Sequence, residues 1–269
     1  MRTGLERNEF CLYYQPVVRL ETGALIGFEA LIRWRHPERG LIVPAEFIHI
    51  VEGNDLILEL CEWAVDKACG QLREWQKINY LAAGLTMSVN LSRKEFRLHD
   101  LTNRVARALG STGQAPEYLK LEITESHIIE NSKFAETVIN RLHNLGIEFS
   151  IEDFGTGYSS LSYLHRLPFS YLKIDRSFVT LMNENAENYE TLRTIIKLAQ
   201  SLKMKVVADG IETSEHVYGL RQLQCDFGQG GFVSKPLDSA NAKRFIEEQL
   251  SDYVPAAHDP VRDMKLSIY

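Results

Sequence analysis

The sequence predicts an α/β fold in the form of an eight-stranded barrel with one antiparallel strand. Eight segments rich in β-branched and aromatic residues recur along the chain of 269 residues. From the second segment onward they alternate with amphipathic helical patterns, and this order requires parallel strands joined by crossover connections. A short turn around Glu21-Thr-Gly23 joins the first two segments, which predicts an antiparallel hairpin. A doubly wound open sheet would have the same order of elements and is the alternative.

The predicted strands are short apolar runs bounded by turn residues. They cover residues 10–18, 25–34, 85–91, 119–124, 147–152, 171–174, 205–208 and 225–227. The predicted helices are segments in which apolar residues recur at three- and four-residue spacing. They cover residues 44–51, 55–78, 100–109, 133–145, 186–202, 214–223 and 239–250. Asp55, Ser214 and Ser239 are suited to cap helix N-termini, and Gly110 and Gly146 are suited to follow helix C-termini.

Composition restricts the class of protein. A hydrophobic content of 45% with 25% charged residues excludes disordered and fibrous chains. The net charge of −6 argues against binding polymeric nucleic acid through a basic surface, whereas a small phosphorylated ligand remains compatible. No apolar run approaches the roughly 18 residues of a membrane span, so we expect no membrane contact by this domain. The four cysteines form no CxxC pair, and we expect reduced thiols and a cytoplasmic location.

The domain organisation is predicted to be simple. No linker or low-complexity segment divides the chain. We therefore expect one barrel domain over residues 1–250, followed by a C-terminal tail over residues 251–269.

Polar side chains interrupt the apolar strands near their C-terminal ends, and in a barrel these positions rise to the same rim. Any one of these polar residues could be a solvated strand edge, a turn residue or an ion-pair partner. Together they predict a functional site at the rim. Clustered carboxylates repel one another unless cations lie among them. A cluster of oxygen ligands without Cys or His favours Mg²⁺ or Mn²⁺ over zinc. The residues are Glu29, Asn90, Glu122, Glu152, Asp153, Lys173, Asp209 and Gln229.

This residue set is suited to phosphoryl chemistry with two metal ions. Two ions about 3.5–4 Å apart would polarise a phosphoryl group and hold the attacking and leaving oxygens in line. Adjacent Glu152 and Asp153 could supply a bridging carboxylate, and Lys173 could orient or deprotonate the attacking water. The segment from Asp153 to Tyr158 contains two glycines and is either a mobile loop over the site or a plain strand-to-helix turn.

Eight motifs resemble one known family, the EAL domains, which are the cyclic di-GMP phosphodiesterases of bacterial signalling. The resemblance begins at Glu29-Ala-Leu31 with Ile32-Arg33-Trp34 and covers residues from about 5 to 250. The other motifs are Tyr13-Tyr-Gln-Pro16, Ser88-Val-Asn-Leu-Ser92, Leu121-Glu-Ile-Thr-Glu125, Asp153-Phe-Gly-Thr-Gly-Tyr-Ser-Ser-Leu161, Leu172-Lys-Ile-Asp-Arg-Ser-Phe178, Ala208-Asp-Gly-Ile-Glu-Thr213 and Gln229-Gly230 ahead of Pro236.

The resemblance implies a modified (β/α)8, TIM-like barrel with an antiparallel first strand. It implies hydrolysis of cyclic di-GMP to linear pGpG with Mg²⁺ or Mn²⁺, and family members often form homodimers. The implied metal ligands are Glu29, Asn90, Glu122, Glu152, Asp153 and Asp209. The implied catalytic residues are Lys173, Glu29, Asp153 and Glu125, the last as the anchor of the loop with Gly155 and Gly157. The implied substrate-binding residues are Gln15, Leu31, Arg33, Asn90, Asp153 and Gln229.

The chain departs from the family pattern at three positions. Glu152 stands where an aspartate is usual, Asp209 stands where a glutamate is usual, and Gly231 replaces a common tyrosine. Because Mg²⁺ tolerates little departure from octahedral geometry, the first two changes favour an alternative. In that alternative the chain is a cyclic di-GMP receptor domain with weak or no turnover. A barrel aldolase that uses Lys173 as a Schiff-base nucleophile is a third hypothesis, but it leaves the acidic cluster without a purpose.

Overall fold

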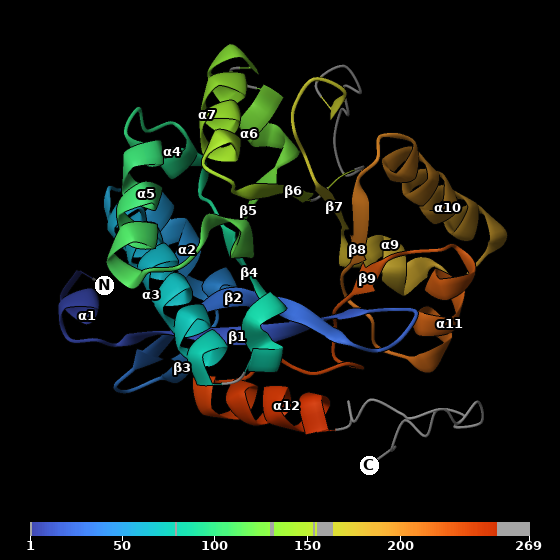
Figure 1. Cartoon of the computed structure of the whole chain (residues 1–269), viewed down its shortest axis with the longest axis horizontal. Helices are drawn as coiled ribbons and strands as arrows, with labels where there is room; N and C mark the ends of the chain where they lie inside the picture. Colours follow the sequence, from blue (N-terminus) through green and yellow to red (C-terminus); the bar gives the residue numbers. More distant parts are fainter. Residues whose placement is uncertain (1, 79, 130–131, 153, 155–163, 252–269) are drawn as a thin grey trace.

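The strands of the computed structural model close into a barrel (Figure 1). The structure describes residues 2–78, 80–129, 132–152, 154 and 164–251. The eight barrel strands are β1 (Phe10–Arg19), β2 (Leu25–His36), β4 (Thr86–Asn90), β5 (Leu119–Thr124), β6 (Glu148–Glu152), β7 (Tyr171–Ile174), β8 (Lys205–Ala208) and β9 (Phe227–Gly228). Each predicted strand is therefore present, with bounds that differ by at most two residues.

The pairing of the first strand closes the barrel. β1 pairs antiparallel with β2, where Gln15 is opposite Glu29, and antiparallel with β9, where Val18 is opposite Gly228. The six remaining neighbours, from β2–β4 round to β8–β9, are parallel. This arrangement confirms the barrel with an antiparallel first strand and excludes the open sheet. One strand was not predicted, the short β3 (Gly40–Ile42), which pairs with the end of β2.

Helices surround the barrel in Figure 1, with α3 and α5 on one side, α10 and α11 on the other, and α12 beside β1. The predicted helices are present as α2 (Pro44–Glu52), α3 (Leu56–Ile78), α5 (Leu101–Thr112), α7 (Ser132–Asn144), α10 (Ala186–Ser201), α11 (Ser214–Gln222) and α12 (Ser239–Ser251). Shorter helices, too brief to show a period, were missed: α1 (Arg2–Glu6), α4 (Arg93–Phe96), α6 (Glu125–Ile129), α9 (Arg176–Leu181), and the 3-10 turns η1 (Tyr80–Gly84) and η2 (Pro116–Tyr118). Among the described helices, none has the length and apolarity needed to cross a membrane. Residues 252–269 of the expected tail lie outside the described residues.

Three predicted helix ends were displaced. Asp238, not Ser239, caps α12, because its Oδ1 accepts a hydrogen bond from the backbone N–H of Asn241 at 2.8 Å. Thr213, not Ser214, caps α11, because its hydroxyl accepts a hydrogen bond from the backbone N–H three residues later. Helix α5 continues through Gly110 and ends at Gly113, whose φ of +68° is the left-handed conformation that glycine adopts readily. Gly146, with φ of +97°, follows the end of α7 as predicted.

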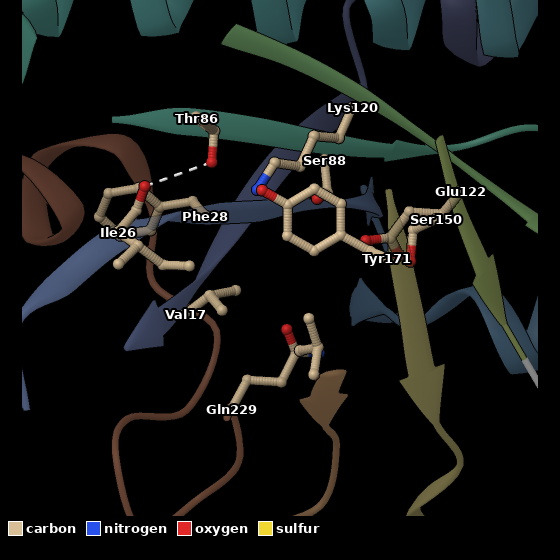
Figure 2. Close-up of a pocket in the computed structure, with 11 residues that line it drawn as sticks. Val17, Ile26, Phe28, Thr86, Ser88, Lys120, Glu122, Ser150, Tyr171 and Gln229 are labelled. Carbon is tan, nitrogen blue, oxygen red and sulfur yellow. Dashed lines mark hydrogen bonds between the residues drawn. The ribbon is translucent and has the colours of Figure 1, made fainter. Parts of the chain in front are cut away.

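The barrel interior is apolar at one end and polar at the other. Val17, Tyr171, Val207 and Phe227 form a buried cluster inside the barrel, and the partly buried Ile26 packs against it. The close-up in Figure 2 shows several of these side chains lining a cavity together with Glu122 and Gln229. The apolar cluster fills the end at which the parallel strands begin, which leaves the opposite end to the polar residues.

Candidate functional site

The C-terminal ends of the parallel strands bring the polar residues of the sequence analysis to one rim. Strand pairing fixes their relative heights: Asn90 of β4 is opposite Glu122 of β5, and Glu122 is opposite Ser150, two residues before Glu152 at the end of β6. The others are Glu29 within β2, Lys173 within β7, and Asp209 and Gln229 directly after β8 and β9. Because parallel strands all end on the same side of a barrel, these seven side chains come from a common edge.

Lys173 lies at the centre of this rim. Its Nζ is 2.7 Å from Glu29 Oε2, 2.7 Å from Glu122 Oε2 and 2.6 Å from Glu152 Oε1. Lys173, Glu29 and Glu122 are 6%, 4% and 5% exposed, so water screens these ion pairs poorly. Asp153, the fourth predicted acidic residue here, lies outside the described residues.

Two amide side chains orient Glu29 from either side. Asn90 Nδ2 donates to Glu29 Oε1 at 2.8 Å, and Gln229 Nε2 donates to Glu29 Oε2 at 2.6 Å. Gln229 Nε2 also donates to Asp209 Oδ1 at 3.1 Å, which connects Asp209 to the cluster. The same Asp209 oxygen accepts from the backbone N–H of Gly210 at 2.7 Å. Both amides therefore have a structural partner in addition to any ligand they contact.

Burial and mutual charge shift the pKa values of this cluster. Burial raises the pKa of Glu29, and burial together with the charge of Glu152 raises the pKa of Glu122 to about 8. Burial alone would lower the pKa of Lys173, but the carboxylates of Glu122, Glu152 and Glu29 outweigh it and hold that pKa well above its usual range. A Schiff-base nucleophile must be neutral, so this environment argues against the aldolase hypothesis.

The carboxylates of Glu29, Glu122 and Glu152 form a group that fits a divalent cation. Each offers an oxygen, and the three oxygens lie within 4.8 Å of one another. When all three are ionised, Lys173 balances only one of the three negative charges, and the excess attracts cations. Oxygen ligands alone suit hard cations of the magnesium and manganese type. The donor set is therefore compatible with the metal site that the sequence predicts.

Three of the predicted substrate-binding residues, Gln15, Leu31 and Arg33, lie along the β1–β2 hairpin, next to the cluster. Gln15 is opposite Glu29, and its Nε2 donates to the backbone oxygen of Ser234 at 3.4 Å. Leu31 and Arg33 follow at alternate positions of β2, and both are half-buried. The Arg33 guanidinium lies 5.8 Å from the ring centroid of Tyr13. This row presents polar and apolar groups beside the acidic rim.

Glu125 follows Glu122 by three residues, at the end of β5. It is the first residue of α6, directly after β5, and it is 5% exposed. Its predicted partners, the loop glycines Gly155 and Gly157, lie outside the described residues. The anchoring role of Glu125 therefore stays a prediction.

Among the buried polar residues inside the barrel that were not predicted are Lys120 and Ser150. Lys120 and Ser150 are 5% and 2% exposed and line the cavity under the cluster (Figure 2). The two-residue period of β-strands could have identified them, because Lys120 precedes Glu122 by two residues and Ser150 precedes Glu152 by two.

Comparison with known proteins gives consistent results along the chain. The model of the EAL domain family matches residues 1–236. The bifunctional diguanylate cyclase/cyclic di-GMP phosphodiesterase MucR of Pseudomonas aeruginosa is 39% identical over 237 residues, which cover 88% of this chain and 34% of that protein. The cyclic di-GMP phosphodiesterase NbdA of the same organism is 38% identical over 255 residues, covering 95% and 32%. This chain thus spans about a third of the length of these curated relatives.

A solved structure shares the fold. The PaMucR phosphodiesterase in its c-di-GMP complex superposes with a TM-score of 0.86 at 38% identity, covering 90% of this chain and 97% of that one.

Proposed function

This chain belongs to the EAL domain family, and we propose that it hydrolyses one phosphodiester bond of cyclic di-GMP to give linear pGpG. The observation that carries the proposal is the convergence of Glu29, Glu122 and Glu152 around Lys173, with all contacts between 2.6 and 2.7 Å. Well-packed apolar residues would stabilise the barrel rim better than a buried acidic cluster with one lysine. The cluster therefore points to a function rather than to structural stability. The cyclic di-GMP named for the relatives supplies a phosphodiester suited to such a site.

We assign the divalent cations as Mg²⁺ or Mn²⁺, with two per site. The proposed ligands are Glu29, Asn90, Glu122, Glu152, Asp153 and Asp209. Bound there, the cations would polarise the phosphoryl oxygens and neutralise developing charge. The protein's own part is to hold the ligands in place, and the hydrogen bonds from Asn90 and Gln229 to Glu29 supply this orientation.

Lys173 is proposed to position the attacking water. A protonated lysine has three N–H donors, so it can hold a carboxylate and the water oxygen at once. Its pKa falls when the carboxylates around it bind cations, and a neutral amine would then accept the proton of the water. The water oxygen forms a bond to phosphorus, the bond from phosphorus to the 3′ oxygen breaks, and that oxygen leaves with a proton as the 3′ hydroxyl of pGpG.

The residues of the β1–β2 hairpin are proposed to hold the dinucleotide. Arg33 has a planar fork of donors that matches two phosphate oxygens. Leu31 offers an apolar contact to a base, and Gln15 offers an amide. Asn90, Asp153 and Gln229 are assigned further contacts at the rim, and Glu125 is assigned to anchor the loop of Gly155 and Gly157.

The chain's wider setting is also a proposal. All four cysteines are free thiols, which supports a cytoplasmic location. We infer a homodimer from the family resemblance, and light scattering after size-exclusion chromatography would test it. A barrel domain over residues 1–250 with a separate tail would be tested by truncation after residue 251, which should leave the melting temperature unchanged.

A receptor that binds cyclic di-GMP without turnover is the second candidate. It is favoured by the altered carboxylate lengths at Glu152 and Asp209, because the metals would then lie away from their working positions. Calorimetry with Ca²⁺ and cyclic di-GMP measures binding, and chromatography of pGpG with Mn²⁺ or Mg²⁺ measures turnover. Binding with turnover supports the phosphodiesterase, binding without turnover supports the receptor, and no binding at tens of micromolar ligand rejects both.

A further inference from the structure

A small cavity lies inside the barrel, directly beneath the carboxylate cluster. It is lined by residues from all eight barrel strands or their ends, among them Glu122 and Gln229 (Figure 2). The room in it for the centres of water molecules is about 20 Å³, and about 10–15 Å³ suffices for one water molecule. The cavity is therefore large enough for one ordered water and too small for an organic ligand.

The polar lining of this cavity calls for a hydrogen-bond partner. Ser150 is 2% exposed, and its hydroxyl has no hydrogen-bond partner among the described residues. Lys120 is 5% exposed, and its ammonium lies 3.8 Å from the centroid of the Tyr171 ring. An ammonium has three donors, which is more than the face of one ring accepts. Because buried polar groups are almost always paired, the Ser150 hydroxyl points to a missing partner, and the Lys120 ammonium can donate to the same group.

The same cavity contacts a proposed metal ligand. Glu122 lines it, and strand pairing places Ser150 opposite Glu122 across β5 and β6. Lys120 lies two residues before Glu122 on the same strand and therefore on the same face. On the side of the rim, Lys173 Nζ donates a hydrogen bond to Glu122 Oε2. A group in the cavity would hold the carboxylate from below.

We propose that this cavity holds an ordered water that accepts hydrogen bonds from Lys120 and Ser150 and donates one to the Glu122 carboxylate. Ser150 and Lys120 are then positioning residues that fix the orientation of Glu122 for metal binding. This inference rests on the proposed metal-dependent function. Partners of this kind are known to set ligand geometry, and their removal weakens metal affinity by about 10–100-fold.

The test measures Mn²⁺ binding by calorimetry on the substrate-free chain. Ser150→Ala is expected to raise the Mn²⁺ dissociation constant about tenfold, with a melting temperature in EDTA within a few degrees of wild type. Lys120→Met is expected to weaken binding as well, although loss of a nearby positive charge would by itself tighten it. Because both side chains hold one water, the double variant should bind no more than about twofold weaker than the weaker single variant.

Thr86→Val is the matched control. Thr86 also lines the cavity, but its hydroxyl already donates to the backbone oxygen of Ile26 at 3.2 Å. Its loss should leave Mn²⁺ affinity unchanged. Two results would overturn the proposal of an ordered water and leave the proposed function standing. In the first, Ser150→Ala and Lys120→Met bind Mn²⁺ as well as wild type does. In the second, a high-resolution crystal structure shows no water in the cavity. If wild type binds no Mn²⁺, the proposed function fails, and the positioning roles fail with it.

Discussion

Replacement of Lys173 by methionine removes the ammonium and keeps most of the side-chain volume. In wild type this ammonium contacts three carboxylates at 2.6–2.7 Å, and the group carries a net charge of −2 when all are ionised, from three negative charges and one positive. The variant would leave Glu29, Glu122 and Glu152 facing one another with a charge of −3. Without metal, we therefore expect the Lys173→Met chain to be strongly destabilised.

The magnitude follows from the burial of these groups. Removing one partner of a buried ion pair costs about 3–5 kcal/mol, because the remaining charge is left without compensation. For a chain of this size the loss corresponds to roughly 6–20 °C in melting temperature. The pKa of Glu122, already raised to about 8, should rise further. A carboxyl group whose folded pKa is raised stabilises the fold below its unfolded pKa and loses that contribution as pH rises through the folded value. The variant should thus be less impaired at pH 6 than at pH 8.5.

The assay is a thermal melt in EDTA at both pH values, repeated with Mn²⁺. Mn²⁺ should restore part of the lost stability, because the three carboxylates are then free to bind it. For the melts in EDTA, Lys120→Met is the matched control, since it removes another buried lysine for which no ion pair is found in the described ranges of the chain. The reasoning is refuted if Lys173→Met melts like wild type at pH 8.5, or if Lys120→Met is equally destabilised.

Three further variants test separate parts of the account. Glu122→Gln removes one excess negative charge but keeps the shape of the side chain. Thermal melts in EDTA should therefore show equal or greater stability than wild type, while calorimetry should show weakened Mn²⁺ binding. A melting temperature several degrees below wild type in EDTA would contradict this. Burial raises the pKa of Glu95 to about 7, so this residue makes wild-type stability fall as pH rises from about 4.5 to 7. In urea titrations, Glu95→Gln should be more stable than wild type by roughly 3 kcal/mol at pH 8 and equally stable at pH 4. Equal pH profiles of unfolding free energy for the variant and wild type would refute the pKa shift. Glu152→Asp combined with Asp209→Glu restores the carboxylate lengths usual in the family and should raise kcat, by up to about a hundredfold; if both single variants and the double run slower than wild type, the native pair is already tuned.

The sequence predicted the long elements well because their signals extend over many residues. The alternation of strand and helix indicated parallel pairing, and the short turn after residue 20 indicated the antiparallel hairpin. Together they favoured the barrel, while the open sheet stayed an alternative until the pairing of β1 with β9 was known. Short elements carry no period, so β3 with its three residues was missed. Helix α4 could have been found, since Ser92 and Glu95 form a capping box in which Ser92 Oγ accepts from the N–H of Glu95 at 3.2 Å.

The site was predictable in membership but not in geometry. Strand ends indicated that Glu29, Glu122 and Glu152 would lie near Lys173, because residue position along a parallel strand fixes height in the barrel. That Lys173 contacts all three, and that Gln229 connects Glu29 to Asp209, depends on the strand register and on side-chain conformations. No local pattern contains that information.

The most direct test of the proposed activity is hydrolysis of cyclic di-GMP in ¹⁸O-labelled water, followed by mass spectrometry of the product. Attack of water on phosphorus with cleavage of the bond to the 3′ oxygen predicts pGpG with one ¹⁸O atom, located in its 5′ phosphate. This product should form with Mn²⁺ or Mg²⁺ and disappear with EDTA or with Lys173→Met. A chain that binds cyclic di-GMP in Ca²⁺ but forms no labelled pGpG with either metal would contradict the account.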